Sequence, residues 1–175
     1  MKSLVIPMAL AAALLGAAPA AAQLGRSSDG PIDVTADELE VQQSECVSIW
    51  RGNAEALQGD TRLRASVMRM YMAKSSSRPG SGSSCGELLR LEAEGGVYYV
   101  TPQQRVRGDR GVYDAVKETV VLTGDVVAVQ GQNVLRGSRM VFNTRTGEGK
   151  MEGQATGRNA TARPRGVFYP SKKGE

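Results

Sequence analysis

The sequence predicts an all-β protein built from repeated antiparallel hairpins. Its clearest feature is an internal repeat, because residues 52–70 and 124–142 match at 8 of 19 positions, without a gap, at an offset of 72. Apolar and polar residues also alternate over short runs along much of the chain, which is typical of half-buried strands. After residue 22 the helical signal is weak everywhere. A unit that recurs at a fixed spacing stacks on its neighbours, so we expect one elongated stack of hairpins.

The N-terminus has the pattern of a secretory signal peptide. Lys2 precedes an apolar run over residues 4–18, and Ala20, Ala21 and Ala22 supply small residues for cleavage. We therefore expect residues 1–22 to be removed; an uncleaved anchor is the alternative, although the run is short for a membrane span. Residues 23–30 are polar without periodicity and are expected to form a flexible leader. The remainder has the length of one domain, which we place at residues 31–153.

The first strands of this domain follow the leader directly. Ile32, Val34 and Ala36 alternate with polar residues, and the alternation slips by one residue near Asp37, which indicates a bulge or turn. Residues 46–50 form a second β-rich run that ends at 51–53. Two further strands are expected about a turn at 58–60.

Residues 74–86 are rich in serine and glycine and are expected to form a flexible loop within the domain. Cys85 lies at its far end, and Cys46 is the other cysteine of the chain. Because an exported protein enters an oxidising compartment, we expect these two residues to form a disulfide, with two free thiols as the alternative. A metal site is not expected, since the chain has no histidine and no Cys-x-x-Cys pair.

The second half of the domain continues as short β-rich runs separated by glycines. These runs are residues 88–96, 97–108, 109–118, 119–131, 133–143 and 146–153. We expect most glycines to occupy tight turns at strand ends, because no phosphate-binding glycine spacing occurs. A loose third copy of the repeat lies between the two clear ones, since an offset of 43 matches Gly52 with Gly95. Residues 154–175 are basic and are expected to form a partly disordered tail.

The alternation assigns an uncharged set of side chains to one face of the strands. Two interpretations remain open: a closed, methionine-rich core, or an apolar trough that stays partly open for an acyl ligand. The candidate trough residues are Ile32, Val34, Ala56, Met68, Met70, Val97, Tyr99, Tyr113, Ala128, Met140 and Phe142, with Ala54 and Val126 on the same face.

Composition excludes several functions. Without histidine the chain has no Ser-His-Asp or Cys-His nucleophile system and none of the common zinc hydrolase sites. Asp37, Glu38 and Glu40 sit in ordinary alternation and indicate a solvated strand face, so we expect no enzyme and no cofactor. The net charge of +4 could favour anionic partners, but with 5% aromatic residues and an export signal we do not expect nucleic acid.

Several short motifs, taken in order, resemble the OstA/LptA family of periplasmic lipopolysaccharide-transport proteins. They are IDVTADELE (32–40), WRGNA (50–54), GDRGVYD (108–114) and VLTGDV (121–126). The resemblance implies an open β-jelly roll, V-shaped in section, whose apolar interior holds the acyl chains of lipid A. It also implies a location in the periplasm and partners with related jelly rolls, one anchored in the inner membrane and one in the outer membrane.

Strand edges of such a jelly roll could accept strands from partners or from further copies of the chain, in a head-to-tail homo-oligomer. The first functional hypothesis is therefore a lipopolysaccharide carrier that bridges the two membranes. The alternative is an assembly module of the same fold that joins partners by its edges and binds no lipid.

Overall fold

The computed structural model describes residues 30–74, 85–154 and 163–170, and these residues form strands and turns without a helix. The predicted signal peptide, nearly all of the leader and most of the Ser/Gly loop and basic tail lie outside the described residues. The strands are β1 (Asp33–Thr35), β2 (Glu38–Gln42), β3 (Val47–Gln58), β4 (Thr61–Lys74), β5 (Cys85–Val100), β6 (Arg105–Asp114), β7 (Thr119–Gln130), β8 (Asn133–Asn143), β9 (Gly149–Glu152) and β10 (Arg165–Val167).

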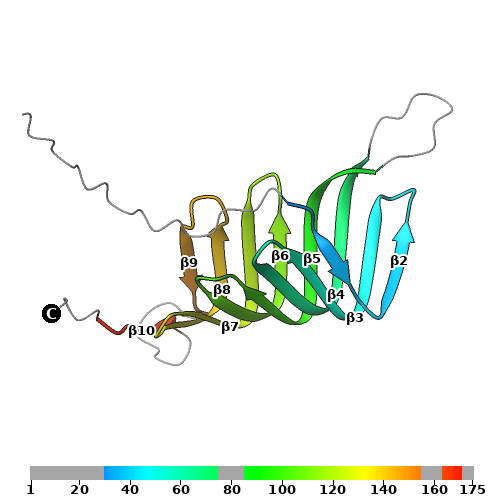
Figure 1. Cartoon of the computed structure of the whole chain (residues 1–175). Helices are drawn as coiled ribbons and strands as arrows, with labels where there is room; N and C mark the ends of the chain where they lie inside the picture. Colours follow the sequence, from blue (N-terminus) through cyan, green and yellow to red (C-terminus); the bar gives the residue numbers. More distant parts are fainter. Residues whose placement is uncertain (1–29, 75–84, 155–162, 171–175) are drawn as a thin grey trace, which may run out of the picture.

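All ten strands belong to one antiparallel sheet, which confirms the predicted all-β class. Strands β3 to β8 pair with their sequence neighbours, so consecutive hairpins lie side by side along the molecule (Figure 1). At one end β1 and β2 pair with successive parts of β3, and at the other end β9 and β10 pair with successive parts of β8. The predicted break near Asp37 and the predicted turn at 58–60 are both confirmed by these strand limits.

A row of β-bulges crosses the sheet and bends its strands. Register shifts occur at Gly52 in β3, at Gly95 and Gly96 in β5, and at Gly124 in β7. All four glycines have positive φ, between 75° and 103°, where a side chain would be strained. A bulge bends its strand and increases the local twist. The expectation that glycines mark strand ends was therefore wrong for these positions, because the chain continues as a strand on both sides of each of them.

The repeat in the sequence encodes this row of bends. A side chain from the neighbouring strand or turn fills the space beside the bulge glycine, namely Asp37 beside Gly52, Ser66 beside Gly95 and Asp109 beside Gly124. The Ser66 hydroxyl donates a hydrogen bond to the carbonyl of Gly95 at 2.7 Å. A Cβ at any of these glycines would overlap its neighbour. We call Gly52, Gly95 and Gly124 the corner glycines. The sequence offset of 72 aligns Gly52 with Gly124, and the offset of 43 aligns Gly52 with Gly95.

The bend divides the sheet into two halves that face each other. Half A contains β2, β9 and segments 47–51, 67–74, 85–94, 110–114, 119–123 and 139–143. Half B contains β1, β10 and segments 54–58, 61–65, 97–100, 105–108, 126–130 and 133–137. Buried side chains from both halves form one hydrophobic cluster, and the Tyr99 ring of half B lies 5.6 Å from the Phe142 ring of half A. The halves are therefore the two walls of an open jelly roll.

The bulges also change which residues point inward. Each bulge in β3, β5 and β7 places two residues opposite a single residue of the adjacent strand. On the adjacent strand, which contributes the single residue, the alternation of inward- and outward-pointing side chains therefore shifts by one position. On β4, for example, Ala65 and Met68 are three positions apart and both are buried. The same shift occurs on β8, where Leu135 and Met140 both belong to the interior.

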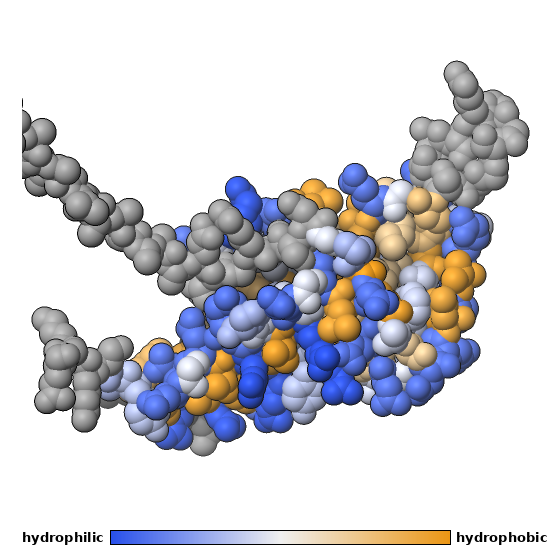
Figure 2. Space-filling view, viewed as in Figure 1, coloured by the Kyte–Doolittle hydropathy of each residue, from blue (hydrophilic) through white to orange (hydrophobic). Residues whose placement is uncertain are grey.

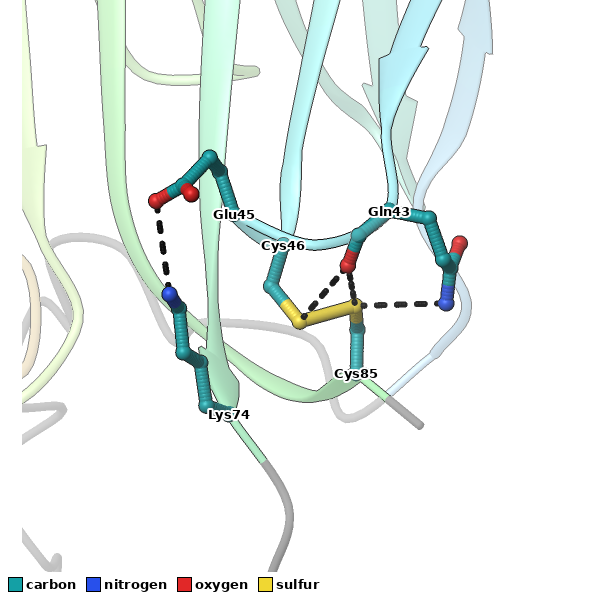
Figure 3. Close-up of a disulfide and its surroundings, with 5 residues drawn as sticks. All are labelled: Gln43, Glu45, Cys46, Lys74 and Cys85. Atoms are coloured by element: carbon teal, nitrogen blue, oxygen red, sulfur yellow. Dashed lines mark hydrogen bonds and ion pairs between the residues drawn. A yellow bond between two sulfur atoms is a disulfide. The ribbon is translucent and has the colours of Figure 1, made fainter. Parts of the chain in front are cut away.

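A disulfide between Cys46 and Cys85 fixes one end of half A (Figure 3). It joins the turn before β3 to the first residue of β5, which is 39 positions further along the chain. The backbone carbonyl of Gln43 lies 3.7 Å from each sulfur, and Lys74 forms an ion pair with Glu45 at 3.3 Å beside it. The disulfide thus ties the start of β3 to the start of β5, on either side of β4 in the sheet.

Replacing both cysteines with serine is expected to lower the free energy of unfolding by about 2–4 kcal/mol, since a loop of this length gains chain entropy when the cross-link is lost. Urea denaturation of the double Cys46→Ser/Cys85→Ser variant, compared with the oxidised parent, measures this difference. A parent that denatures identically with and without reductant would contradict the expectation.

Candidate functional site

A cavity of about 420 Å³ lies between the inner faces of halves A and B. Its walls come from β3, β4, β5, β6 and β7, and the turns at 59–60 and 101–103 contribute one margin. Most of the lining is apolar, and the only charged lining residue, Asp60, lies in an exposed turn. Principal lining residues are Ile32, Ala56, Leu63, Leu88, Leu91, Ala93, Val97, Tyr99, Tyr113, Val120 and Leu122.

Apolar side chains also reach the surface of the molecule. Figure 2 shows them interrupting the hydrophilic surface, most densely toward the end where Figure 1 places β2, β3 and β4. On β2, Leu39 and Val41 are 49% and 59% exposed. They pair with Trp50 and Ser48 of β3 and therefore lie on the inner face of the sheet. The interior thus opens toward an apolar edge.

The candidate trough residues divide into two groups in the structure. Those that line the cavity are Ile32, Ala56, Val97, Tyr99 and Tyr113. The remainder pack in or against the hydrophobic cluster and do not line the cavity; they are Val34, Met68, Met70, Ala128, Met140 and Phe142. All of them except Ile32 are buried or half-buried, and Ile32 is 38% exposed at one margin. Their role in lipid binding stays a prediction.

Sequence reasoning missed several cavity residues, chiefly Leu63, Leu88, Leu91, Val120 and Leu122. Leu63 was missed because the bulge beside Ser66 reverses the alternation that Met68 and Met70 establish on the same strand. A signal was available in the repeat, where Leu63 and Leu135 coincide. Both residues prove to face the interior.

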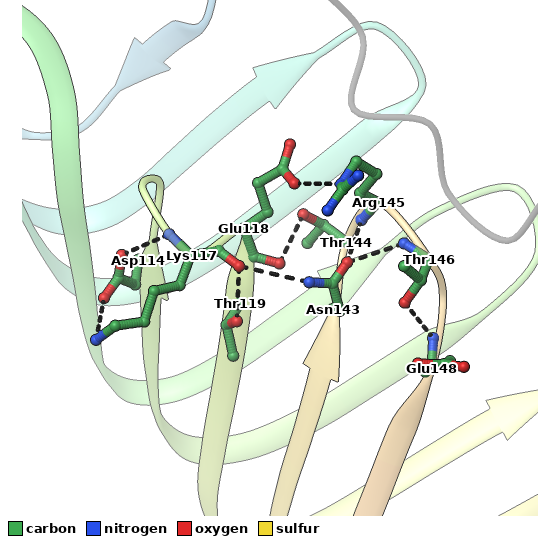
Figure 4. A network of polar contacts seen from close by, with 9 residues as sticks. All are labelled: Asp114, Lys117, Glu118, Thr119, Asn143, Thr144, Arg145, Thr146 and Glu148. Carbon is green, nitrogen blue, oxygen red and sulfur yellow. Dashed lines mark hydrogen bonds and ion pairs between the residues drawn. The ribbon is translucent and has the colours of Figure 1, made fainter.

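Hydrogen bonds and an ion pair join two neighbouring turns, at residues 115–118 and 144–147 (Figure 4), and one of these turns contributes to the margin of the cavity. Thr144, which lines the cavity, donates hydrogen bonds from its backbone N–H and its hydroxyl to the carbonyl of Glu118, at 2.8 and 3.1 Å. The Arg145 guanidinium pairs with the Glu118 carboxylate at 2.7 Å. The side-chain carbonyl of Asn143 accepts the backbone N–H groups of Arg145 and Thr146, both at 2.9 Å. These bonds give this margin of the cavity a fixed shape.

The interior is electrically neutral. Burial raises the pKa of Tyr99, and burial is also the main cause that raises the pKa of Tyr113. Both phenols therefore stay protonated at neutral pH. The described residues contain no cluster of three histidine, cysteine or carboxylate side chains suited to a metal ion. Such a site can accommodate apolar groups, and it offers no paired acid and base.

The raised pKa of Tyr99 predicts a loss of stability at alkaline pH. The unfolded chain releases this proton near pH 10, while the folded chain keeps it to higher pH. Above about pH 10 the folded state therefore binds more protons, and the free energy of unfolding falls as the pH rises. Denaturation at pH 9 and pH 11 is expected to show this fall, and Tyr99→Phe is expected to reduce it. An equal fall in both proteins would contradict the assignment.

No helix in the described part of the chain is long and apolar enough to cross a membrane.

A comparison with protein-family models identifies a family for this chain. A family model described as the LptA/(LptD N-terminal domain) LPS transport protein matches residues 33–148. An uncharacterized protein of Rhizobium meliloti is 30% identical over 127 residues, which cover 72% of this chain and 67% of that protein. The lipopolysaccharide export system protein LptH of Pseudomonas aeruginosa is 27% identical over 175 residues, with 93% of this chain and 92% of that protein covered.

The fold also matches a solved structure. The crystal structure of Pseudomonas aeruginosa LptH, described as the LptA-homologous periplasmic component of the lipopolysaccharide transport device, superposes with a TM-score of 0.67. The match covers 82% of this chain and 99% of that one at 23% identity. It supports the open β-jelly roll that the strand pairing describes.

Proposed function

Because the chain belongs to the LptA/(LptD N-terminal domain) family of lipopolysaccharide-transport proteins, we propose that it is a periplasmic carrier for lipopolysaccharide. On this proposal the acyl chains of lipid A lie between halves A and B. The observation that supports it most directly is the cavity, which both walls line with apolar side chains and which contains no buried charge. The carrier would bind and release its cargo without changing it chemically.

The physical need for such a carrier is large. Moving one methylene group from apolar surroundings into water costs about 0.8 kcal/mol, so an acyl chain of about a dozen carbons would lose on the order of 10 kcal/mol in the aqueous gap. The cavity volume of 420 Å³ lies within the range of about 300–1,000 Å³ that is usual for small-molecule sites. A lipid with several acyl chains would therefore need the two walls to move apart.

The partners would be transport proteins with related jelly rolls, one anchored in the inner membrane and one in the outer membrane. The exposed Leu39 and Val41 of β2 favour contacts at this end, because they extend the apolar interior to an unpaired strand edge. The same observation favours the alternative, an assembly module that joins partners by its edges and binds no lipid. A head-to-tail homo-oligomer would use the same edges.

Photo-crosslinking separates the two candidates. A photoreactive phenylalanine analogue at Tyr99, inside the cavity, is expected to crosslink to lipopolysaccharide. The same analogue at Tyr71, on the outer face of half A, is the matched control and is expected to give little crosslinked lipid. Crosslinks from Tyr99 to protein alone, together with a purified chain that yields no lipid to organic solvent, would contradict the carrier and favour the assembly module.

A further inference from the structure

The outer face of half B carries two rows of arginines that cross the sheet. Residues directly opposite each other on paired strands share a face, so the register defines each row. One row contains Glu55, Arg64, Tyr98, Arg107, Val127, Arg136 and Arg165. The second contains Leu57, Arg62, Val100, Arg105, Val129, Val134 and Val167. We call the arginines of both rows the basic face.

The basic face has little compensating negative charge over most of its width. Segments 97–108, 126–137 and 165–167 contain four of its arginines and no aspartate or glutamate. The nearby carboxylates lie at its margins: Asp33 and Glu55 on β1 and β3, Asp60 in the turn between β3 and β4, and Asp109 and Asp125 at the bend. Glu55 pairs with Arg62 at 2.6 Å and with Arg64 at 3.7 Å, and Asp125 pairs with Arg107 at 2.6 Å.

Within the described residues Arg105, Arg136 and Arg165 form no ion pair, and all three are exposed. The outer face of half A differs, because most of its charges are paired. Its ion pairs include Arg51–Glu40, Arg69–Glu94, Arg90–Glu92, Arg139–Glu152 and Lys150–Glu152. Among the described residues, unpaired positive charge is thus concentrated on the outer face of half B.

A shallow hollow lies on part of the basic face. It has a volume of about 510 Å³, and its lining includes Arg62, Arg64, Arg105 and Tyr98. A guanidinium group can donate two parallel hydrogen bonds to a phosphate, which makes arginine well suited to bind it. Tyr98, 50% exposed, has an amphipathic ring of the kind that sits at a membrane–water interface.

We propose that the basic face docks on the phosphate-bearing headgroups of an anionic phospholipid membrane. The arginines lie from β4 to β10, and these six strands about 4.8 Å apart spread them over roughly 24 Å, so they can meet several headgroups at once. Headgroups of a fluid membrane can move to match this spacing, whereas a folded acidic protein would need carboxylates already in register. Docking through the outer face leaves the cavity on the opposite face of the same wall accessible. Each arginine near an anionic surface is expected to strengthen binding about fivefold.

The test uses vesicles free of lipopolysaccharide, so it is independent of the carrier function. The purified chain is expected to sediment with vesicles of phosphatidylglycerol and phosphatidylethanolamine and to stay in solution with vesicles of phosphatidylcholine alone. Raising the salt from about 0.05 M to about 0.5 M is expected to release it, because screening weakens attraction between exposed charges. Equal sedimentation with both kinds of vesicle, or binding that resists salt, would overturn the proposal.

A pair of charge-matched variants locates the surface. Arg105→Gln/Arg136→Gln is expected to weaken vesicle binding at least tenfold. Arg90→Gln/Arg110→Gln removes the same charge from the exposed outer face of half A and is expected to change binding less than twofold. Charges outside the described residues are the same in both variants. Equal losses would overturn the proposal, as would an absence of vesicle binding combined with arginine-dependent binding to polyglutamate, which would indicate an acidic protein partner.

Discussion

Leu63→Glu is expected to reduce lipopolysaccharide loading at least tenfold, which corresponds to a loss of about 1.4 kcal/mol or more. Leu63 lines the cavity from half B and is half-buried. A carboxylate there can stay hydrated in the free protein, so the fold is expected to survive. Once acyl chains fill the cavity, the same carboxylate would be buried without a partner, at a cost of several kcal/mol. The lipid bound per protein, measured after detergent exchange, gives the loss.

The matched control is Val121→Glu, on the outer face of β7. Val121 is also half-buried, and its neighbours across the strands, Val112 and Val141, leave no carboxylate directly opposite. The lipopolysaccharide bound per Val121→Glu protein is expected to remain within twofold of the parent value. Normal loading of a folded Leu63→Glu protein would remove the cavity as the binding site. Met70→Glu is a less specific test, because Met70 belongs to the packed cluster and its replacement also threatens folding.

Gly124→Ala is expected to lower the free energy of unfolding by about 2–5 kcal/mol. Gly124 has a φ of 103°, where a Cβ costs about 1–2 kcal/mol. The added Cβ would also overlap the side chain of Asp109, including its Cβ, which no rotation of the carboxylate can clear. Overpacking of this kind adds about 1–3 kcal/mol. Urea denaturation of the folded fraction measures the total.

Gly96→Ala separates the cost of backbone strain at positive φ from the cost of the overlap with a neighbouring side chain. Gly96 is also a bulge glycine with positive φ, but a Cβ there meets nothing within 4 Å. Its replacement is expected to cost only the backbone strain of about 1–2 kcal/mol. Adding Asp109→Gly to Gly124→Ala is expected to recover part of the loss through a favourable coupling energy. If Gly96→Ala and Gly124→Ala prove equally destabilising, the overlap with Asp109 is unimportant.

Much of the fold could be predicted from the sequence because the repeat and the alternation both reflect strand pairing. The hairpin turn at 58–60 and the break near Asp37 follow from local residue patterns, and both are confirmed. The bulges could not be predicted in the same way. A glycine in a bulge and a glycine in a turn satisfy the same need for positive φ, so the sequence alone does not distinguish a bend within a strand from the end of a strand.

That ambiguity also limited the candidate site. Residues on β3, β5 and β7 keep their alternation through the bulge, so Ala56, Val97 and Tyr99 were placed on the correct face. On β4 the alternation shifts at Ser66, so Leu63 was not assigned to the interior. The division between packed cluster and open cavity depends on how the two halves meet, and strand periodicity contains no information about that contact.

The row of corner glycines has a mechanical consequence. Every strand from β3 to β8 runs through the bend, so the two walls are continuous backbone, joined along one closed seam and apart along the opposite one. Neither wall can slide past the other or detach. The gap between the walls can widen only if all six strands bend together at the seam, which then acts as a single hinge.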